Sequence, residues 1–212
     1  MCIRDRYNGQ LQTLALFDKP DPLNGPFFEE TYYISPGRVD PAQQTRLYDV
    51  IQATCEAYGL REGPIHAECR VNGQGVWVLE VAARTIGGLC GRLLQFGTGL
   101  SLEQLVLQHA MNQPVPVENL PHGAGVLMIP IPCGGIFKRV EGLLQARRVP
   151  WIEEISIQIR EGYAVTPLPE GASYLGFIFA RAPDADRAEQ ALREAHACLK
   201  IVIDPLIQVH VA

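Results

Sequence analysis

Residues 63–88, GPIHAECRVNGQGVWVLEVAARTIGG, decide the fold of the first half of the chain. Two runs that alternate between polar and apolar residues, at about 64–71 and 76–82, flank the turn segment Asn72-Gly73-Gln74-Gly75. Alternation with a period of two is the pattern of a half-buried strand, and Gly with Asn is typical of a tight turn. The stretch therefore predicts an antiparallel β-hairpin.

The length of the loop sets which residues face each other across this hairpin. With the three-residue loop Gly73-Gln74-Gly75, a common type with glycine at its left-handed position, Glu68 lies directly opposite Glu80. Successive side chains point to opposite faces of a strand, so one face is polar and the other is apolar. The polar face carries His66, Glu68, Arg70, Glu80 and Arg84, and the apolar face carries Ile65, Ala67, Cys69, Val71, Trp77, Leu79 and Val81.

Two opposed glutamates are the chemically informative feature of the polar face. Like charges directly across a strand pair are destabilising, and a cation or a shared proton between them removes the repulsion. Carboxylate oxygens suit Mg²⁺, which keeps its other positions for water and phosphates. Arg84, on the same face if the strand continues, would meet an anion brought by the metal, and backbone N–H groups at Gly87-Gly88 could approach that anion. The alternative is a solvated face on which Arg70 and Arg84 neutralise the glutamates.

Composition excludes several classes of protein. The chain has 212 residues, of which 47% are hydrophobic and 19% charged, so it can bury a core of its own. Its net charge of -5 argues against nucleic-acid binding, and no stretch approaches the ~20 apolar residues of a membrane span. The six scattered cysteines lack a Cys-x-x-Cys pair, which excludes the common zinc spacings and a disulfide framework and favours a cytoplasmic protein with reduced thiols.

Helices and strands mix along the rest of the chain, so the expected fold class is α+β. Residues 1–6 are expected to be an extraneous leader, the strand at 7–17 is expected to pair with the strand at 27–34, and the proline-rich segment 113–122 is the candidate domain boundary. The expected helices are 41–58, 101–112 and 184–201, and the expected strands beyond the boundary are 123–132, 137–142, 153–165 and 174–182.

The hairpin resembles the metal-binding core of the ATP-grasp superfamily. Glu80 follows Glu68 by twelve residues and Arg84 follows Glu80 by four, an order and spacing that match those of the family. Many ATP-grasp enzymes read Glu-x-Asn-x-Arg at the second strand, whereas this chain has Ala82 at the asparagine position. That departure, together with His66-Ala67-Glu68, is similar to the branch of L-amino-acid (dipeptide) ligases.

The resemblance implies a fold and an activity. The fold is the second half of an ATP-grasp domain, an antiparallel sheet with helices over 7–113, followed by a small α+β C-terminal domain over 122–212. The activity is an ATP- and Mg²⁺-dependent carboxylate–amine ligase that forms an acyl phosphate and acts on small-molecule carboxylates and amines such as amino acids. Glu68 and Glu80 would bind Mg²⁺ or Mn²⁺, and these glutamates and catalytic Arg84 would contact ATP.

Further residues and partners follow from the same resemblance. His66, Gly87, Gly88 and Lys19 are candidate substrate-binding residues. The first ATP-grasp half is expected in a missing N-terminal part of the same enzyme, so we expect this chain alone to be inactive. A homodimer is compatible with the sequence, and Ala82 leaves the number of metal ions open. The rival interpretations are a biotin-carboxylase-like ATP-grasp enzyme and a non-catalytic binding or assembly domain that retains the hairpin.

Overall fold

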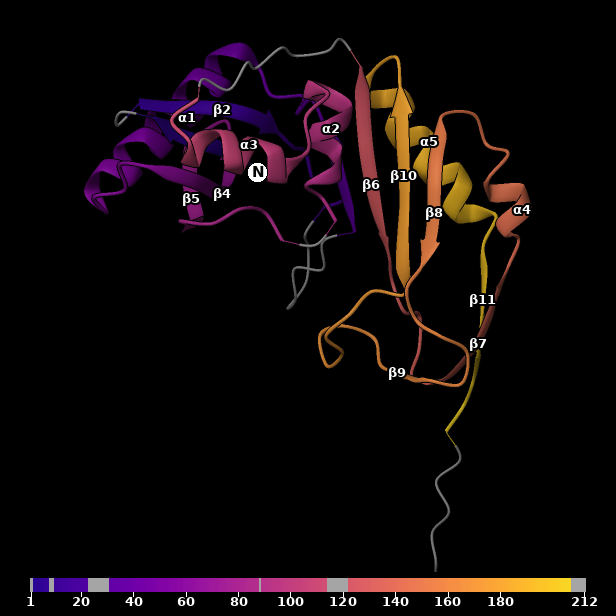
Figure 1. Cartoon of the computed structure of the whole chain (residues 1–212). Helices are drawn as coiled ribbons and strands as arrows, with labels where there is room; N and C mark the ends of the chain where they lie inside the picture. The colour runs from indigo at the N-terminus through magenta and orange to yellow at the C-terminus, as the bar shows by residue number, and fades with distance from the viewer. Residues whose placement is uncertain (1, 8–9, 23–30, 88, 114–121, 207–212) are drawn as a thin grey trace, which may run out of the picture. The chain divides into compact units, whose positions relative to one another are not determined.

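Two compact units, each a mixture of helices and antiparallel strands, make up the computed structural model of the chain (Figure 1). The first unit contains Met1–Asp18 and Ile34–Ala124, and the second contains Lys19–Tyr33 and Gly125–Ala212. Within the described part of the chain, no helix is long and apolar enough to cross a membrane. The described residues are 2–7, 10–22, 31–87, 89–113 and 122–206.

The first unit is built on a four-stranded sheet in the order β2-β1-β4-β5. Residues 2–6 of the expected leader form most of β1, whose backbone pairs with β2 on one side and with β4 on the other. Helix α1 packs against β4 and β5. The elements are β1 (Cys2–Tyr7), β2 (Gln10–Leu16), α1 (Pro41–Ala57), β4 (Gly63–Asn72), β5 (Gly75–Ala82), α2 (Arg92–Thr98) and α3 (Leu102–Ala110).

Helix α1 supports the sheet and starts where the sequence predicts. The Asp40 carboxylate accepts a hydrogen bond from the Ala42 backbone N–H at 2.9 Å, and proline occupies the first helical turn. The helix ends at Ala57, close to the predicted end. Its buried side chains meet the inner face of β4 in one apolar cluster: Leu16, Leu47, Ile51, Cys55, Ile65 and Ala67.

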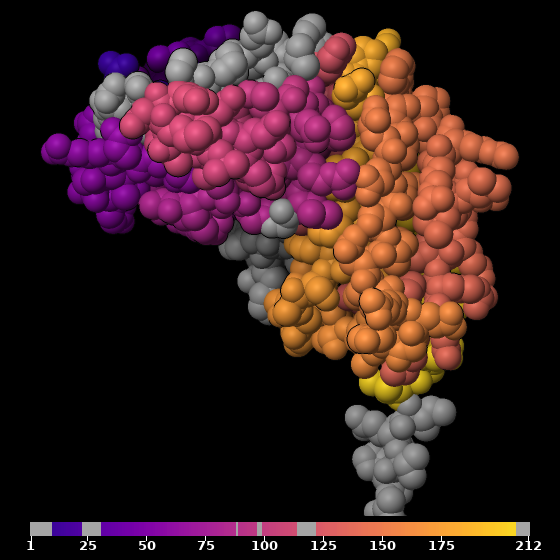
Figure 2. All heavy atoms as spheres, viewed as in Figure 1, coloured from indigo at the N-terminus to yellow at the C-terminus, as the bar shows by residue number. Residues whose placement is uncertain are grey.

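Helix α3 also begins as its sequence predicts. The Ser101 hydroxyl accepts a hydrogen bond from the Gln104 N–H at 3.2 Å, and the Gln104 side chain accepts one from the Ser101 N–H at 2.8 Å. This reciprocal pair is a capping box. Figure 2 shows α3, in pink, on the surface of the first unit. Leu107 and Met111 are exposed.

The predicted pairing of 7–17 with 27–34 is wrong. The backbone of β2 is hydrogen-bonded to β1, a strand that the sequence pattern does not predict. Strand β3 (Tyr32–Ser35) belongs to a different sheet, in which it lies beside β6. The two segments meet in an isolated bridge between Asp18 and Ile34. Residues 23–30 of the expected strand and 114–121 of the expected boundary lie outside the described residues.

The second unit holds two further sheets, in the orders β3-β6-β10-β8 and β11-β7-β9. Helix α5 packs along β10 and β8 (Figure 1), and β6 is buried throughout. The elements are β6 (Gly123–Ile129), β7 (Gly135–Glu141), α4 (Leu143–Ala146), β8 (Ile152–Ile157), β9 (Ala164–Val165), β10 (Gly176–Ala182), α5 (Ala185–Ala197) and β11 (Lys200–Asp204).

Two predicted elements of the second unit extend too far. The strand expected over 153–165 is divided into β8 and β9, because the chain turns at Gly162, which has φ 87° and donates a hydrogen bond to the Phe137 carbonyl at 2.8 Å. The helix expected over 184–201 ends at Ala197, since Lys200–Asp204 pairs with β7 as a strand. In both places tertiary hydrogen bonds override the local pattern.

Arg193 of α5 explains why Lys19–Tyr33 belongs with the second unit. Its Nη2 atom lies 2.5 Å from Asp21 Oδ1 and 2.8 Å from Glu189 Oε1, and its guanidinium lies 4.4 Å from the centroid of the Tyr32 ring. Partial burial lowers the pKa of Arg193, but its hydrogen bonds with Asp21 and Glu189 outweigh burial and raise the pKa above its usual value. Burial raises the pKa of Tyr32 against the opposing charge of Arg193.

A double-mutant cycle between Arg193→Gln and Asp21→Asn tests this attachment. The two side chains are 42% and 39% exposed, so solvent screening limits the expected coupling to about 1 kcal/mol. Urea unfolding of the four proteins measures it. The matched control pairs Arg193→Gln with Glu153→Gln, which contacts Arg181 instead, and should be additive. Additivity in the Arg193–Asp21 cycle as well would show that the contact does not hold the segment.

Candidate functional site

The β4–β5 hairpin places Glu68 directly opposite Glu80 and His66 opposite Ala82, which confirms the predicted pairing. The loop, however, differs from the prediction. Asn72 pairs with Gly75, so the loop has two residues, and the Asn72 side-chain oxygen accepts hydrogen bonds from the backbone N–H groups of Gln74 at 2.8 Å and of Gly75 at 3.3 Å.

A β-bulge restores the pairing of the glutamates. From a two-residue loop, an uninterrupted ladder would set Glu68 opposite Leu79. The register shifts instead between Glu68 and Cys69: Val78 faces Cys69 while Glu80 faces Glu68, so Leu79 is an extra residue in β5. Bulges are common beside active sites, where they redirect side chains. Here the bulge brings two carboxylates to opposed positions.

The two-residue loop and the bulge together change the predicted apolar face. Trp77 is paired with Arg70 and is 43% exposed, and Leu79 is 61% exposed, so neither belongs to the core as predicted. Val76 and Val81 pack against the buried cluster beneath the sheet. The polar face therefore gains an indole that the alternation pattern assigned to the interior.

Arg84 contacts Glu80, although not through a continued strand. Strand β5 ends at Ala82 and the chain then bends. Arg84 Nη2 lies 3.3 Å from Glu80 Oε1, and Nη1 donates a hydrogen bond to the Thr85 carbonyl at 3.0 Å. Both side chains of the ion pair are about half exposed, at 54% and 51%, so the pair contributes only about 0–1 kcal/mol to stability.

His66 and Glu68 form the inner part of the site. His66 is 5% exposed and its Nε2 atom lies 3.6 Å from Glu68 Oε1. The Glu68 side chain is 19% exposed, compared with 51% for Glu80. The two opposed carboxylates therefore differ in environment: one lies against a buried imidazole, and the other lies beside an exposed guanidinium.

The remaining candidates are distributed over both units. A side chain at Gly87 would meet no atom within 4 Å, so its backbone is open to close approach, whereas Gly88 lies outside the described residues. Lys19 belongs to the second unit, where its ammonium lies 5.4 Å from the centroid of the Tyr33 ring. Within the described residues, no group of three or more His, Cys, Asp or Glu side chains could hold a metal ion. A metal bound by Glu68 and Glu80 would therefore complete its coordination with water and substrate oxygens.

Comparison with known families identifies the class of protein. Residues 5–92 match the family model of the ATP-grasp domain, and residues 127–204 match L-amino acid ligase C-terminal domain 2. The chain is thus similar to ATP-grasp proteins over residues 5–92 and to L-amino acid ligases over residues 127–204.

Solved structures agree with these matches. An L-amino acid ligase from Bacillus licheniformis superposes with a TM-score of 0.84 at 26% identity, over 96% of this chain and 51% of that one. The fold also matches a phosphoribosylglycinamide synthetase from Anaerococcus prevotii (TM-score 0.77, 13% identity, 96% and 52% covered) and an N5-carboxyaminoimidazole ribonucleotide synthetase from Thermotoga maritima (0.70, 17%, 96% and 52%). The chain thus spans about half the length of these proteins. A search of curated proteins finds no match.

Cysteine cross-linking tests the bulged register. Glu68→Cys with Glu80→Cys should form a disulfide under mild oxidation, because directly opposed residues have Cβ atoms about 5 Å apart. Mass spectrometry of proteolytic peptides distinguishes this link from links to the native cysteines. Glu68→Cys with Val78→Cys, which point to opposite faces, is the control. Faster linkage of Glu68→Cys to Leu79→Cys would indicate a hairpin without the bulge.

Proposed function

We propose that these residues are part of an ATP- and Mg²⁺-dependent carboxylate–amine ligase that joins amino acids, or a similar carboxylate and amine, in the cytoplasm. The observation that carries this proposal is the opposition of Glu68 and Glu80 with Arg84 against Glu80. Because the chain spans about half the length of the structures it matches, the activity is proposed for a complete enzyme that contains these residues.

The donor set fits a hard divalent cation. Glu68 and Glu80 offer carboxylate oxygens from adjacent strands, and the exposure of Glu80 leaves room for water and phosphate ligands. Bound there, Mg²⁺ would neutralise charge on the phosphates of ATP. Ala82 supplies no side-chain oxygen, so we assign the protein's share of the site to the two glutamates. The buried imidazole of His66 would act as a positioning residue for Glu68.

The proposed reaction has two steps. An oxygen of the substrate carboxylate attacks the γ-phosphorus of ATP, and the bond from that phosphorus to the β–γ bridging oxygen breaks. ADP is the leaving group, and an acyl phosphate is formed. The nitrogen of the amine then attacks the acyl carbon, inorganic phosphate leaves, and the nitrogen loses a proton. Arg84 would bind oxygens of the transferred phosphoryl group, since a guanidinium can contact two oxygens at once, and the open backbone at Gly87 would add an N–H donor.

The second unit favours this proposal over its rivals. A biotin-carboxylase-like enzyme shares the ATP-grasp fold, but residues 127–204 match a domain of L-amino acid ligases. A hairpin that served only as a scaffold would not need the bulge, and without the bulge Leu79 rather than Glu80 would lie opposite Glu68. The scaffold role therefore gives no reason for the opposed carboxylates. A binding site for a cation accounts for the opposed carboxylates and for the bulge that aligns them.

Substitution of Arg84 tests its role in phosphoryl transfer. In the complete enzyme, Arg84→Lys should lower kcat by about a hundredfold while changing the KM for ATP much less, because the lost contact acts on charge that develops during transfer. Steady-state ADP release at saturating amino acids measures both constants. Arg70→Lys, an arginine on the same hairpin face, is the control and should turn over normally. Wild-type turnover in Arg84→Lys would reduce Arg84 to a neutralising surface charge.

Removal of one carboxylate charge tests the metal site. Glu80→Gln should raise the Mg²⁺ concentration needed for half-maximal ADP release by about tenfold or more, because the cation loses a charged ligand. The variant should also lose the thermal stabilisation that Mg²⁺ and nucleotide together give the wild type. Glu62→Gln, which removes an exposed carboxylate elsewhere in the first unit, is the control. An unchanged Mg²⁺ requirement in Glu80→Gln would contradict the proposed ligand.

A further inference from the structure

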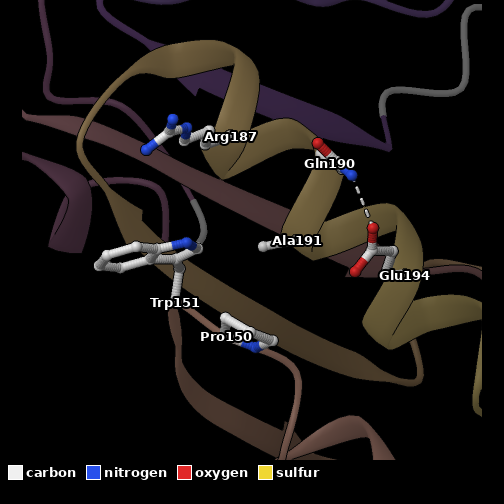
Figure 3. A pocket seen from close by; sticks show the side chains of 6 residues that line it. All are labelled: Pro150, Trp151, Arg187, Gln190, Ala191 and Glu194. Carbon is white, nitrogen blue, oxygen red and sulfur yellow. Dashed lines mark hydrogen bonds between the residues drawn. The ribbon is translucent and has the colours of Figure 1, made fainter.

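The second unit contains a hollow of about 210 Å³ between helix α5 and the turn that precedes β8. Figure 3 shows Pro150 and Trp151 on one side of this hollow and the side chains of α5 on the other. No proposed step of the ligase reaction uses it. The lining residues are Pro150, Trp151, Arg187, Gln190, Ala191 and Glu194.

Trp151 is held beside the hollow in an unfavourable backbone conformation. The Ile152 N–H donates to the Val149 carbonyl at 3.4 Å, and Trp151 has φ 73°, as the third residue of a type II turn requires. Glycine or asparagine is favoured at that position, and a bulky side chain there is an outlier. The Arg181 N–H fixes the Trp151 carbonyl at 2.9 Å, yet the side chain stays 48% exposed. Core packing therefore does not explain the placement of the indole.

The opposite wall is one face of α5 with opposite charges at its two ends. Arg187, Gln190, Ala191 and Glu194 follow at helical spacing, and the small, buried Ala191 leaves space between the charged ends. Glu194 follows Arg187 by seven positions, which is about 10 Å along the helix axis. Gln190 donates a hydrogen bond to the Glu194 carboxylate at 2.8 Å, while Arg187 Nε lies 3.6 Å from Asp184 Oδ2.

We propose that this hollow binds a short zwitterionic peptide, of the size of a dipeptide with one apolar side chain. The peptide carboxylate would contact Arg187, its ammonium would contact Glu194, and its apolar side chain would lie against Trp151 and Pro150. An extended dipeptide is about 7 Å long, and a hydrogen bond of about 3 Å at each end extends its reach to about 13 Å, which is enough to span the ~10 Å between the two helix positions. A free amino acid carries both charges on one carbon and cannot reach both ends. This site goes beyond the proposed ligase activity, because it needs neither ATP nor the Glu68–Glu80 pair.

Tryptophan fluorescence tests the proposal directly. The chain has two tryptophans, so Trp77→Phe leaves Trp151 as the only one. Titration of this protein with alanyl-leucine, without nucleotide, should change the fluorescence in a saturable way with a Kd of about 1 mM or below. N-acetylated alanyl-leucine, alanyl-leucine amide and free leucine should each bind at least about tenfold more weakly. Equal binding of free leucine, or the absence of a saturable change, would overturn the proposal.

Charge-removing variants in the same background locate the site. Arg187→Gln should weaken binding of alanyl-leucine about tenfold and should bind the peptide amide as well as the wild type does; Glu194→Gln should do the same for the N-acetylated peptide. Arg160→Gln, an exposed arginine outside the hollow, is the matched control and should bind normally. If both pocket variants bind like the control, the peptide does not occupy this hollow. Because no step involves ATP, failure here is distinct from failure of the proposed ligase reaction, which ADP release reports.

Discussion

The opposition of Glu68 and Glu80 across β4 and β5 is the constraint on which the site depends. Two like charges at facing positions weaken a strand pair, so the rest of the first unit must hold the hairpin together. It does so from the other face of the sheet, where α1 presents a buried row that packs against Ile65 and Ala67. The apolar face fixes the register, because a slip of one residue would bring polar side chains into that core.

The bulge at Leu79 allows β5 to pack against the core along its length and still place Glu80 opposite Glu68. Near the loop, the ladder follows the short turn capped by Asn72, and Val76 lies over the apolar cluster. Beyond the bulge the ladder is offset by one residue, and Val81 returns to the same cluster while Glu80 faces Glu68. One inserted residue thus satisfies the packing of both ends of β5 and the pairing of the carboxylates.

Local signals in the sequence were sufficient for the hairpin, for α1 with its Asp40 cap and for the capping box of α3. The pairing of the glutamates was also correct, although it rested on a loop one residue too long, and the bulge compensates for that residue. Partners distant in sequence were not predictable in the same way. The place of β2 depends on β1, the end of α5 depends on the pairing of β11 with β7, and the exposure of Trp77 depends on the hairpin register set by the two-residue loop. Each outcome is decided by hydrogen bonds between segments, which a periodic pattern does not encode.

The two carboxylates differ in solvent exposure, which suits a site that binds and releases its ligands. Glu68 is the more enclosed, and its neighbour His66 is almost fully buried, so this side of the site is shaped before any ligand arrives. Glu80 and Arg84 are half exposed and contact each other at 3.3 Å, a separation typical of a weak surface ion pair. Such a pair keeps the guanidinium near the carboxylate, and breaking it to bind other partners costs little free energy. In the proposed ligase, a cation would bind the Glu80 carboxylate while a phosphate would bind the Arg84 guanidinium, and the two charges that now neutralise each other would neutralise the ligands instead.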